Sequence, residues 1–252
     1  MTAKTEKSLH VAVLMGGWSA EREVSLSSGN GVADALEKNG HKVSRVDMDR
    51  NVAQILTGLR PDVVFNALHG VPGEDGSVQG MLDLMQIPYT HSGMVTSVIA
   101  IDKELTKQQL VPNYGYPIGR DVAGPWQEFE ELLAEPFIKG RELTTAVVGG
   151  KALCVTELKT AQGFYDYAAK YTEGLTVHVC PAEIPEDIEK LCLDYALRAH
   201  QVLGCKGTSR TDFRWDDELG AAGLFVLETN TQPGMTPLSL VPEQARQMGI
   251  SY

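Results

Sequence analysis

Short apolar runs alternate with helical patterns over the first hundred residues of this chain. Strands are expected at 10–15, 43–47 and 62–68, with a helix that ends near 39–40 and another at 77–85. Such alternation predicts an open parallel sheet with helices on both faces, because consecutive parallel strands need crossover connections. The N-terminal half is therefore assigned to the α/β class.

Two glycine-containing turns follow strands of that sheet. Ligands of open α/β sheets bind at the carboxyl ends of strands, where Gly16–Gly17 and His69–Gly70 lie. The first turn offers backbone N–H groups to an anion, although Glu21 and Glu23 also suit a purely structural role as complements of the helix dipole. His69 is open to two interpretations as well, since a histidine at a strand end is more often a structural donor than a catalyst.

The pattern changes after a helix expected at 95–110. Two strands at 141–148 and 152–158 flank a Gly-Gly-Lys turn, which predicts a β-hairpin. A helix with acidic residues near its start is expected at 185–203. An antiparallel, α+β arrangement is therefore expected in the second half of the chain.

Composition excludes several classes of protein. The chain has 252 residues, 43% of them hydrophobic, which suffices for a large core in one or two domains. A net charge of −11 argues against a general nucleic-acid binder and against a binder of acidic membranes. The four cysteines have no metal-type spacing and favour reduced structural thiols in a cytosol. Since no apolar run has the length of a membrane span, we expect a soluble, cytoplasmic protein with a small anionic ligand.

One late segment has the most specific chemistry in the chain. In a strand, Glu228 and Asn230 point to the same side and present two oxygen ligands beside a glycine turn. A strand at 209–215 can fold back against it, so that Asp212 adds a third oxygen and Arg210 a positive charge for phosphate. This pattern suits Mg²⁺, but it is also typical of a hairpin with one solvated polar face. The metal site therefore needs support from elsewhere in the chain.

Several motifs occur in order along nearly the whole chain. They are GGWSAEREVSL at 16–26, ALHG at 67–70, GEDG at 73–76, DK at 102–103, GFYDYAAKY at 163–171, GCKG at 204–207, LETNTQPGMT at 227–236 and SLVP at 239–242. Together they resemble the D-alanine–D-alanine ligase family of the ATP-grasp superfamily. The resemblance implies an N-terminal α/β substrate domain over 1–102, a central ATP-grasp domain over 103–141, and a C-terminal ATP-grasp domain with the metal site over 142–252.

The resemblance implies ATP-dependent ligation of two D-alanine molecules for the peptidoglycan precursor, and hence a part in cell-wall biogenesis and cell shape. ATP would phosphorylate the first D-alanine, and the amine of the second would attack the acylphosphate. Asp212, Glu228 and Asn230 would bind Mg²⁺, expected as two ions that Mn²⁺ can replace. Arg210 would face the charge that develops during transfer, and the Gly234 amide would hold the oxyanion.

The substrate roles that the resemblance implies fall on five further residues. Glu21 would pair with the ammonium group of the first D-alanine, and His69 would lie near its carboxylate. Ser239 and Leu240 would orient the carboxylate of the second D-alanine. Tyr171 would link the mobile loop of the family to Glu21.

The resemblance also implies a set of ATP-binding residues: Lys103, Glu135, Phe137, Ile138, Glu142 and Lys170. Both lysines would face the phosphates. Glu135 would accept from the adenine amino group and Glu142 from ribose hydroxyls. Phe137 and Ile138 are equally consistent with ordinary strand core.

One part of the family pattern is missing. Between Lys103 and Glu135 the chain is much shorter than the family, and it lacks a second ATP-binding lysine, a glycine–serine phosphate loop and a catalytic serine. We expect the gene product to contain this closing loop between Pro112 and Asn113, since such loops have low local stability until a ligand binds. A chain from which the loop is genuinely deleted is expected to lose most ligase activity. The last helix of the family has no counterpart after Tyr252.

Two other functions remain open. A D-alanine–D-lactate (depsipeptide) ligase would use the same fold and metal chemistry, although the Lys170–Tyr171 pattern favours an amine acceptor by resemblance. A non-catalytic nucleotide-binding module would explain the missing phosphate loop. A homodimer is expected from the family alone, and neither nucleic acid nor membrane is expected as a partner.

Overall fold

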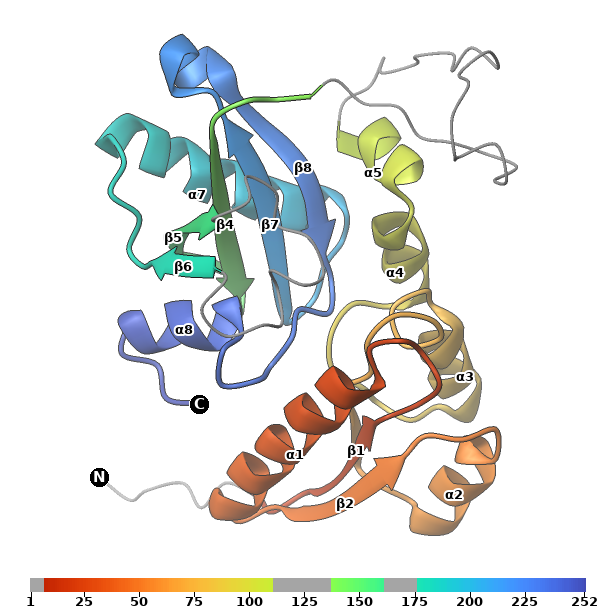
Figure 1. Cartoon of the computed structure of the whole chain (residues 1–252). Coiled ribbons are helices and arrows are strands. Elements are labelled where there is room, and N and C mark those ends of the chain that lie inside the picture. The colour runs from red at the N-terminus through yellow and green to blue at the C-terminus, as the bar shows by residue number, and fades with distance from the viewer. Residues whose placement is uncertain (1–6, 111–136, 161–175) are drawn as a thin grey trace.

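The computed structural model describes residues 7–110, 137–160 and 176–252, and their strands form two sheets (Figure 1). The N-terminal sheet is parallel with the order β2-β1-β3, from β1 (His10–Met15), β2 (Lys42–Asp47) and β3 (Val63–Asn66). The second sheet is antiparallel with the order β6-β5-β4-β7-β8, from β4 (Arg141–Val148), β5 (Lys151–Thr160), β6 (Thr176–Val179), β7 (Thr208–Trp215) and β8 (Leu224–Asn230). The predicted change from α/β to α+β is confirmed.

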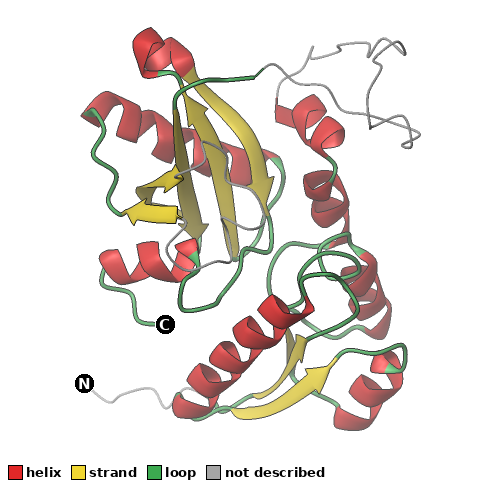
Figure 2. Cartoon of the chain, in the orientation of Figure 1, coloured by secondary structure: helices red, strands yellow, loops and turns green. Residues whose placement is uncertain are grey.

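Helices cover both faces of the parallel sheet. They are α1 (Arg22–Lys38), α2 (Val52–Leu59) and α3 (Ser77–Met85) (Figure 2). Val11 and Val13 of the central strand pack on the side of α1, whereas Ala12 and Leu14 pack on the side of α2 and α3. Because both sets are buried, β1 reads as a continuous apolar run rather than an alternating one. Burial continues through Gly16 and Gly17 after the strand, and Trp18 is the first exposed residue.

The helix predicted at 95–110 is two helices, α4 (Met94–Ile101) and α5 (Lys103–Leu110). Asp102 between them is extended, with φ −94° and ψ 110°, and its Oδ1 accepts from the backbone N–H of Leu105 at 2.9 Å. Aspartate favours such a cap over a helix interior because its side chain competes for backbone donors. The interruption makes Lys103 the first residue of α5.

Other elements differ from the prediction in length or were not predicted. α7 (Glu186–Val202) lies within one residue of its expected range at each end, and β3 is shorter than the predicted 62–68. The sequence did not predict α2, β6, α8 (Leu240–Gln247) or the 3-10 segment Asp217–Gly223. Elements of four to eight residues have too few repeats for a periodic signal to stand out.

The antiparallel sheet has one apolar and one largely polar face. Leu143, Phe213 and Trp215 pack against α7 in one core cluster. A register shift follows the Asp212–Glu228 pair, because the next pair is Phe213–Val226 and Leu227 is an extra residue. The bulge turns Glu228 away from the side of Val226, so that the polar end of β8 lies on the face opposite α7.

The remaining sequence-based expectations have mixed outcomes. The three domain boundaries stay predictions, since the central domain over 103–141 is described only at α5 and from residue 137 onward. The Pro112–Asn113 junction lies outside the described residues.

All four cysteines are free thiols, and burial raises the pKa of Cys192 to about 12. Among the described residues, no helix is long and apolar enough to cross a membrane.

Truncating Phe213 tests how strongly the core beneath the polar face supports it. Phe213 is fully buried, so Phe213→Ala is expected to lower the free energy of unfolding by about 3–5 kcal/mol through lost burial and a residual cavity. Urea unfolding measures this change. Leu219, which is 58% exposed, is the control, and Leu219→Ala is expected to change stability by less than about 0.5 kcal/mol. Equal effects of the two substitutions would contradict the assigned core.

Candidate active site

β7 and β8 place the three predicted metal ligands on one face of the antiparallel sheet. Asp212 lies directly opposite Glu228, and Asn230 lies opposite Arg210. Directly opposed residues in an antiparallel pair project to the same face. The pairing that the metal hypothesis requires is thus present, while metal binding itself stays a prediction.

The donor atoms on this face suit a hard divalent cation. Asp212 accepts from Thr144 Oγ1 at 2.5 Å and from Arg210 Nε and Nη2 at 2.8 and 2.7 Å. The amide of Asn230 is oriented by the backbone N–H of Gln232, which donates to Oδ1 at 2.7 Å. Two carboxylates and an amide oxygen match the ligands of Mg²⁺, with phosphate and water completing the shell. Within the described ranges, no three His, Cys, Asp or Glu side chains form a metal cluster, so the amide is a necessary member of this set.

Two cationic side chains form ion pairs with the carboxylates that are predicted to bind the metal. Lys103 Nζ is 2.9 Å from Glu228 Oε2, and Arg210 pairs with Asp212. Lys103 and Glu228 line a pocket of about 140 Å³ whose other lining residues are Glu74, Ala100, Ile101, Thr229, Asn230 and Thr231. The pocket therefore combines the start of α5 with the end of β8, where phosphate and metal charges could both be balanced.

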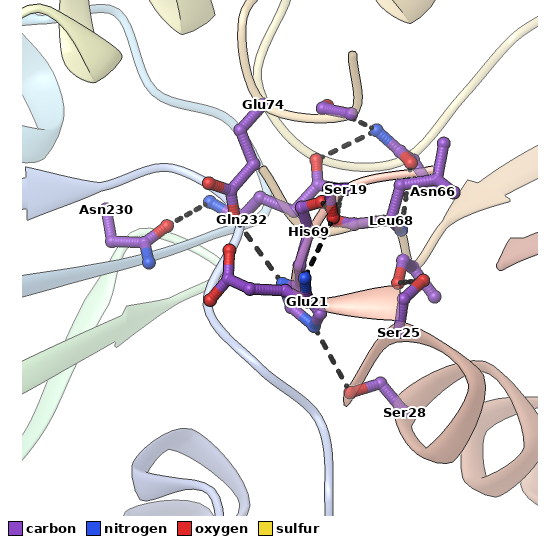
Figure 3. Close-up of polar contacts among 12 residues, drawn as sticks. Ser19, Glu21, Ser25, Ser28, Asn66, Leu68, His69, Glu74, Asn230 and Gln232 are labelled. Carbon is purple, nitrogen blue, oxygen red and sulfur yellow. Dashed lines mark hydrogen bonds and ion pairs between the residues drawn. The ribbon is translucent and has the colours of Figure 1, made fainter. Parts of the chain in front are cut away.

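The predicted substrate residues of the N-terminal sheet lie close together at its carboxyl edge. A Cβ atom on Gly70 would lie 3.3 Å from Glu21 Oε2, so the Glu21 carboxylate is beside the His69–Gly70 turn. His69 is 7% exposed, with Nδ1 3.4 Å from Glu74 Oε1 and Nε2 3.3 Å from Ser28 Oγ (Figure 3). The imidazole is thus held from both sides.

The loop after β8 brings the second half of the site to this edge. A Cβ atom on Gly234 would lie 3.9 Å from His69 Cε1 and 2.9 Å from Ser239 Oγ. The backbone N–H of Met235 donates to Ser28 Oγ at 3.2 Å. Gly234 and Ser239 therefore face the residues of the N-terminal sheet.

Ser239 and Leu240 lie at the start of α8. Ser239 Oγ accepts from the Thr236 backbone N–H at 2.9 Å, and Leu240 is the buried first residue of the helix. The unpaired N–H groups and partial positive charge of a helix start favour a carboxylate. This position suits the role predicted for the pair.

The predicted nucleotide residues are described only in part. Arg214 Nε donates to the Ile138 carbonyl at 3.1 Å, and its Nη1 donates to Glu142 Oε2 at 3.0 Å. Phe137 is 70% exposed, which disagrees with an ordinary core position. Glu135, Lys170 and Tyr171 lie outside the described residues.

Comparisons with known proteins give one consistent result. The family model described as "D-ala D-ala ligase C-terminus" matches residues 122–252, and the one described as "D-ala D-ala ligase N-terminus" matches residues 47–92. A protein of Erythrobacter litoralis named D-alanine–D-alanine ligase is 64% identical, covering 98% of this chain and 91% of that protein. The chain belongs to the D-alanine–D-alanine ligase family.

Further relatives and solved structures of this family agree. The D-alanine–D-alanine ligase of Zymomonas mobilis is 55% identical over 96% of this chain and 90% of its own length. A Bacillus anthracis D-alanine–D-alanine ligase crystallised with ATP superposes with a TM-score of 0.78 at 25% identity, covering 97% of this chain and 94% of that chain. These matches agree with the sheet arrangement described above.

This ligase-family chain is shorter than its relatives within the matched region. The match to the Erythrobacter litoralis protein runs over 293 residues, more than the 252 residues present here. The relative therefore has aligned positions without a counterpart in this chain. A loop missing from this chain requires such a difference in length. The position of the loop, between Pro112 and Asn113, stays a prediction.

Several residues that contact the predicted site groups were not predicted from the sequence. Ser28, Glu74, Thr144, Arg214 and Gln232 all bond directly to predicted site groups. Arg214 could have been found, because residues 210, 212 and 214 share one face of a strand. The others depend on contacts between distant segments, for which the sequence has no local signal.

His91 is expected to make the stability of this ligase-family protein depend on pH. Burial, and to a smaller extent the nearby His69, lowers the pKa of His91 to about 4. An unfolded histidine titrates near pH ~6.5, so between that value and pH 4 the unfolded chain binds a proton that the folded protein excludes. Stability is therefore expected to be full above that window and to fall as the pH drops through it, measured as the urea midpoint.

The variant His91→Asn removes this titration and keeps a residue that tolerates the positive φ of 73° at this position. Its urea midpoint is expected to change less between pH 7 and pH 4 than that of the wild type. Burial also lowers the pKa of His200, so the slope is reduced rather than removed. An unchanged slope in the variant would show that His91 does not contribute.

Proposed function

We propose that this chain catalyses the ATP-dependent ligation of two D-alanine molecules to D-alanyl-D-alanine. The observation that supports this best is the meeting of two half-sites, Glu21 and His69 at the parallel sheet with Gly234 and Ser239 after β8. Membership of the D-alanine–D-alanine ligase family and the names of close relatives support the same activity.

In the first step, Glu21 pairs with the ammonium group of the first D-alanine and His69 lies near its carboxylate. An oxygen of that carboxylate attacks the γ-phosphorus of ATP, so that the acylphosphate forms and ADP leaves. Arg210 and Lys103 face the phosphate oxygens and balance the charge that develops during transfer.

In the second step, the amine of the second D-alanine attacks the acyl carbon and phosphate leaves. Ser239 and the start of α8 hold the carboxylate of this second substrate, which sets the direction of attack. The backbone N–H of Gly234 donates to the oxyanion of the tetrahedral intermediate. The attacking nitrogen then loses a proton to give the dipeptide.

Asp212, Glu228 and Asn230 would bind Mg²⁺, in two ions that Mn²⁺ can replace. A divalent ion held by these residues would supply positive charge to balance the phosphates. Of the described ATP-site residues, Ile138 and Glu142 would contact adenine and ribose, with Arg214 holding both. The exposed Phe137 would cover the base, while Glu135 and Lys170 keep their expected roles. A cytosolic homodimer is part of this proposal.

One coupled assay tests the proposal. Phosphate release from ATP by the full-length gene product, which includes the expected closing loop, is followed with D-alanine, L-alanine or D-alanine plus D-lactate, and the products are identified by mass spectrometry. We expect phosphate release that requires D-alanine and yields D-alanyl-D-alanine. A D-alanyl-D-lactate product would favour the depsipeptide ligase, and ATP binding without any product would favour the binding module.

A further inference from the structure

Gln232 lies buried between the two half-sites. It is 2% exposed and follows β8 in the loop that reaches the N-terminal sheet. Its side chain accepts from Asn66 Nδ2 at 2.9 Å and donates through Nε2 to the Leu68 carbonyl at 2.7 Å (Figure 3). Its backbone N–H donates to Asn230 Oδ1 at 2.7 Å. One residue therefore bonds to a candidate metal ligand and to the loop that contains His69.

Backbone groups fix the orientation of both amides. The Leu68 N–H donates to Asn66 Oδ1 at 3.2 Å, which leaves Asn66 Nδ2 to donate to the Gly73 carbonyl at 3.0 Å and to Gln232. Gln232 must then present its oxygen to Asn66 and its nitrogen to Leu68. Glutamine supplies this acceptor and donor on one side chain, and neither an apolar residue nor an ionised glutamate supplies both.

The same contacts hold the loop on both sides of His69. Leu68 precedes His69, and Gly73 precedes Glu74, whose carboxylate is 3.4 Å from His69 Nδ1. The Gly73 carbonyl also accepts from Gln79 Nε2 at 2.8 Å, and Gln79 is 1% exposed. Buried polar groups rigidify the segments that they join when they are paired, as the side-chain amides of Asn66 and Gln232 are here. The buried amides thus set where the His69 imidazole lies.

We propose that Gln232 is a positioning residue that holds Asn230 and the His69 loop in one fixed geometry. It links metal binding on β8 to substrate binding at the parallel sheet without contacting either ligand. The inference rests on the proposed function, because it assigns the two ends of the network to metal and to D-alanine. The side chain anchors the loop to Asn66 and Leu68, and the backbone N–H of the anchored residue orients Asn230. Removing the side chain frees that backbone N–H to move, so the binding of both ligands should be weakened together.

The test is the variant Gln232→Met, which keeps the length of the side chain and removes both polar atoms. The KM for D-alanine and the half-saturating Mg²⁺ concentration are each expected to rise about tenfold, because two buried partners lose their hydrogen bonds. Calorimetric titration with D-alanine, and with Mn²⁺ in place of Mg²⁺, measures binding without turnover. Both dissociation constants are expected to rise by a similar factor.

Two controls separate positioning from general stability. Ile188→Ala opens a cavity under α7, in a core cluster that contains no residue of the network, and should lower the melting temperature without moving either binding constant. Gln247→Met makes the same chemical change on the exposed end of α8 and should alter neither property. A Gln232→Met protein that only melts earlier, like Ile188→Ala, overturns the inference.

The outcomes also distinguish this inference from the proposed function. If the wild type forms no dipeptide but binds D-alanine and Mn²⁺, and Gln232→Met weakens both, the function fails and the positioning role stands. If the wild type forms dipeptide and the variant binds both as the wild type does, the positioning role fails alone. A wild type that binds neither ligand overturns both.

Discussion

Replacing Glu228 by glutamine is expected to lower kcat for dipeptide formation by on the order of a thousandfold, since metal-ion charge stabilisation supplies several kcal/mol and each ~1.4 kcal/mol is tenfold. Stability should change little, because the Glu228–Lys103 pair is partly exposed, at 31% and 47%, and such pairs contribute at most about 1 kcal/mol. Initial rates across a Mg²⁺ series, with thermal unfolding of the same samples, measure both effects.

The control for this substitution is Glu37→Gln. Glu37 is also a partly exposed carboxylate, at 45%, and pairs with Arg45 at 2.6 Å in the last turn of α1, outside the candidate site. Its substitution should leave kcat within about twofold of the wild type, as expected for a surface charge. If Glu228→Gln and Glu37→Gln have equal rates, Glu228 is not a ligand of a catalytic metal.

Restoring the segment that the family has between Pro112 and Asn113 is expected to raise kcat of this 252-residue chain by about 10²–10⁴-fold. The expected segment supplies a lysine and backbone N–H groups to the phosphates, and two charge-assisted hydrogen bonds of about 1.5–3 kcal/mol each account for this range. The segment of the Erythrobacter litoralis relative is the natural insert, because that protein is 64% identical. Phosphate release at saturating D-alanine and ATP is the measurement.

A glycine–serine insert of equal length is the control for this experiment. It restores the spacing without the charged and phosphate-binding groups, so kcat should stay near that of the shorter chain. D-Alanine binding should be similar in all three proteins, because Glu21, His69 and Ser239 lie outside the insertion. A 252-residue chain that already turns over as fast as the relative would show that the segment is dispensable.

The fold was largely predictable because its main elements have strong local signals. β1 is apolar throughout since both of its faces are buried, and α1 and α7 each have 17 residues, enough for several turns of periodicity. The break at Asp102 was not predicted, since it depends on one capping hydrogen bond within an otherwise helical pattern. Short elements such as α2 and α8 become stable only through packing, which no local sequence pattern contains.

The candidate site shows the same contrast between residues with a local sequence signal and residues that depend on long-range contacts. Spacing within one strand was enough to place Glu228 with Asn230, and a hairpin brought Asp212 opposite Glu228 and Arg210 opposite Asn230. The bond between Asn66 and Gln232 joins residues 166 positions apart, and nothing local to either residue indicates it. Roles for Glu21 and Ser239 came from the family resemblance rather than from spacing, because neither residue type is diagnostic by itself.

The extra residue at Leu227 has an evolutionary consequence. Leu224 and Val226 belong to the packing against α7, while Glu228 and Asn230, at the same parity in the sequence, point to the opposite side of the sheet. Deleting Leu227 would place Val226 directly before Glu228 and restore ordinary alternation, because their partners Phe213 and Asp212 are already consecutive. Glu228 and Asn230 would stay on the face opposite α7, so the identity of these two residues should be more strictly preserved among relatives than the length of the strand at this point.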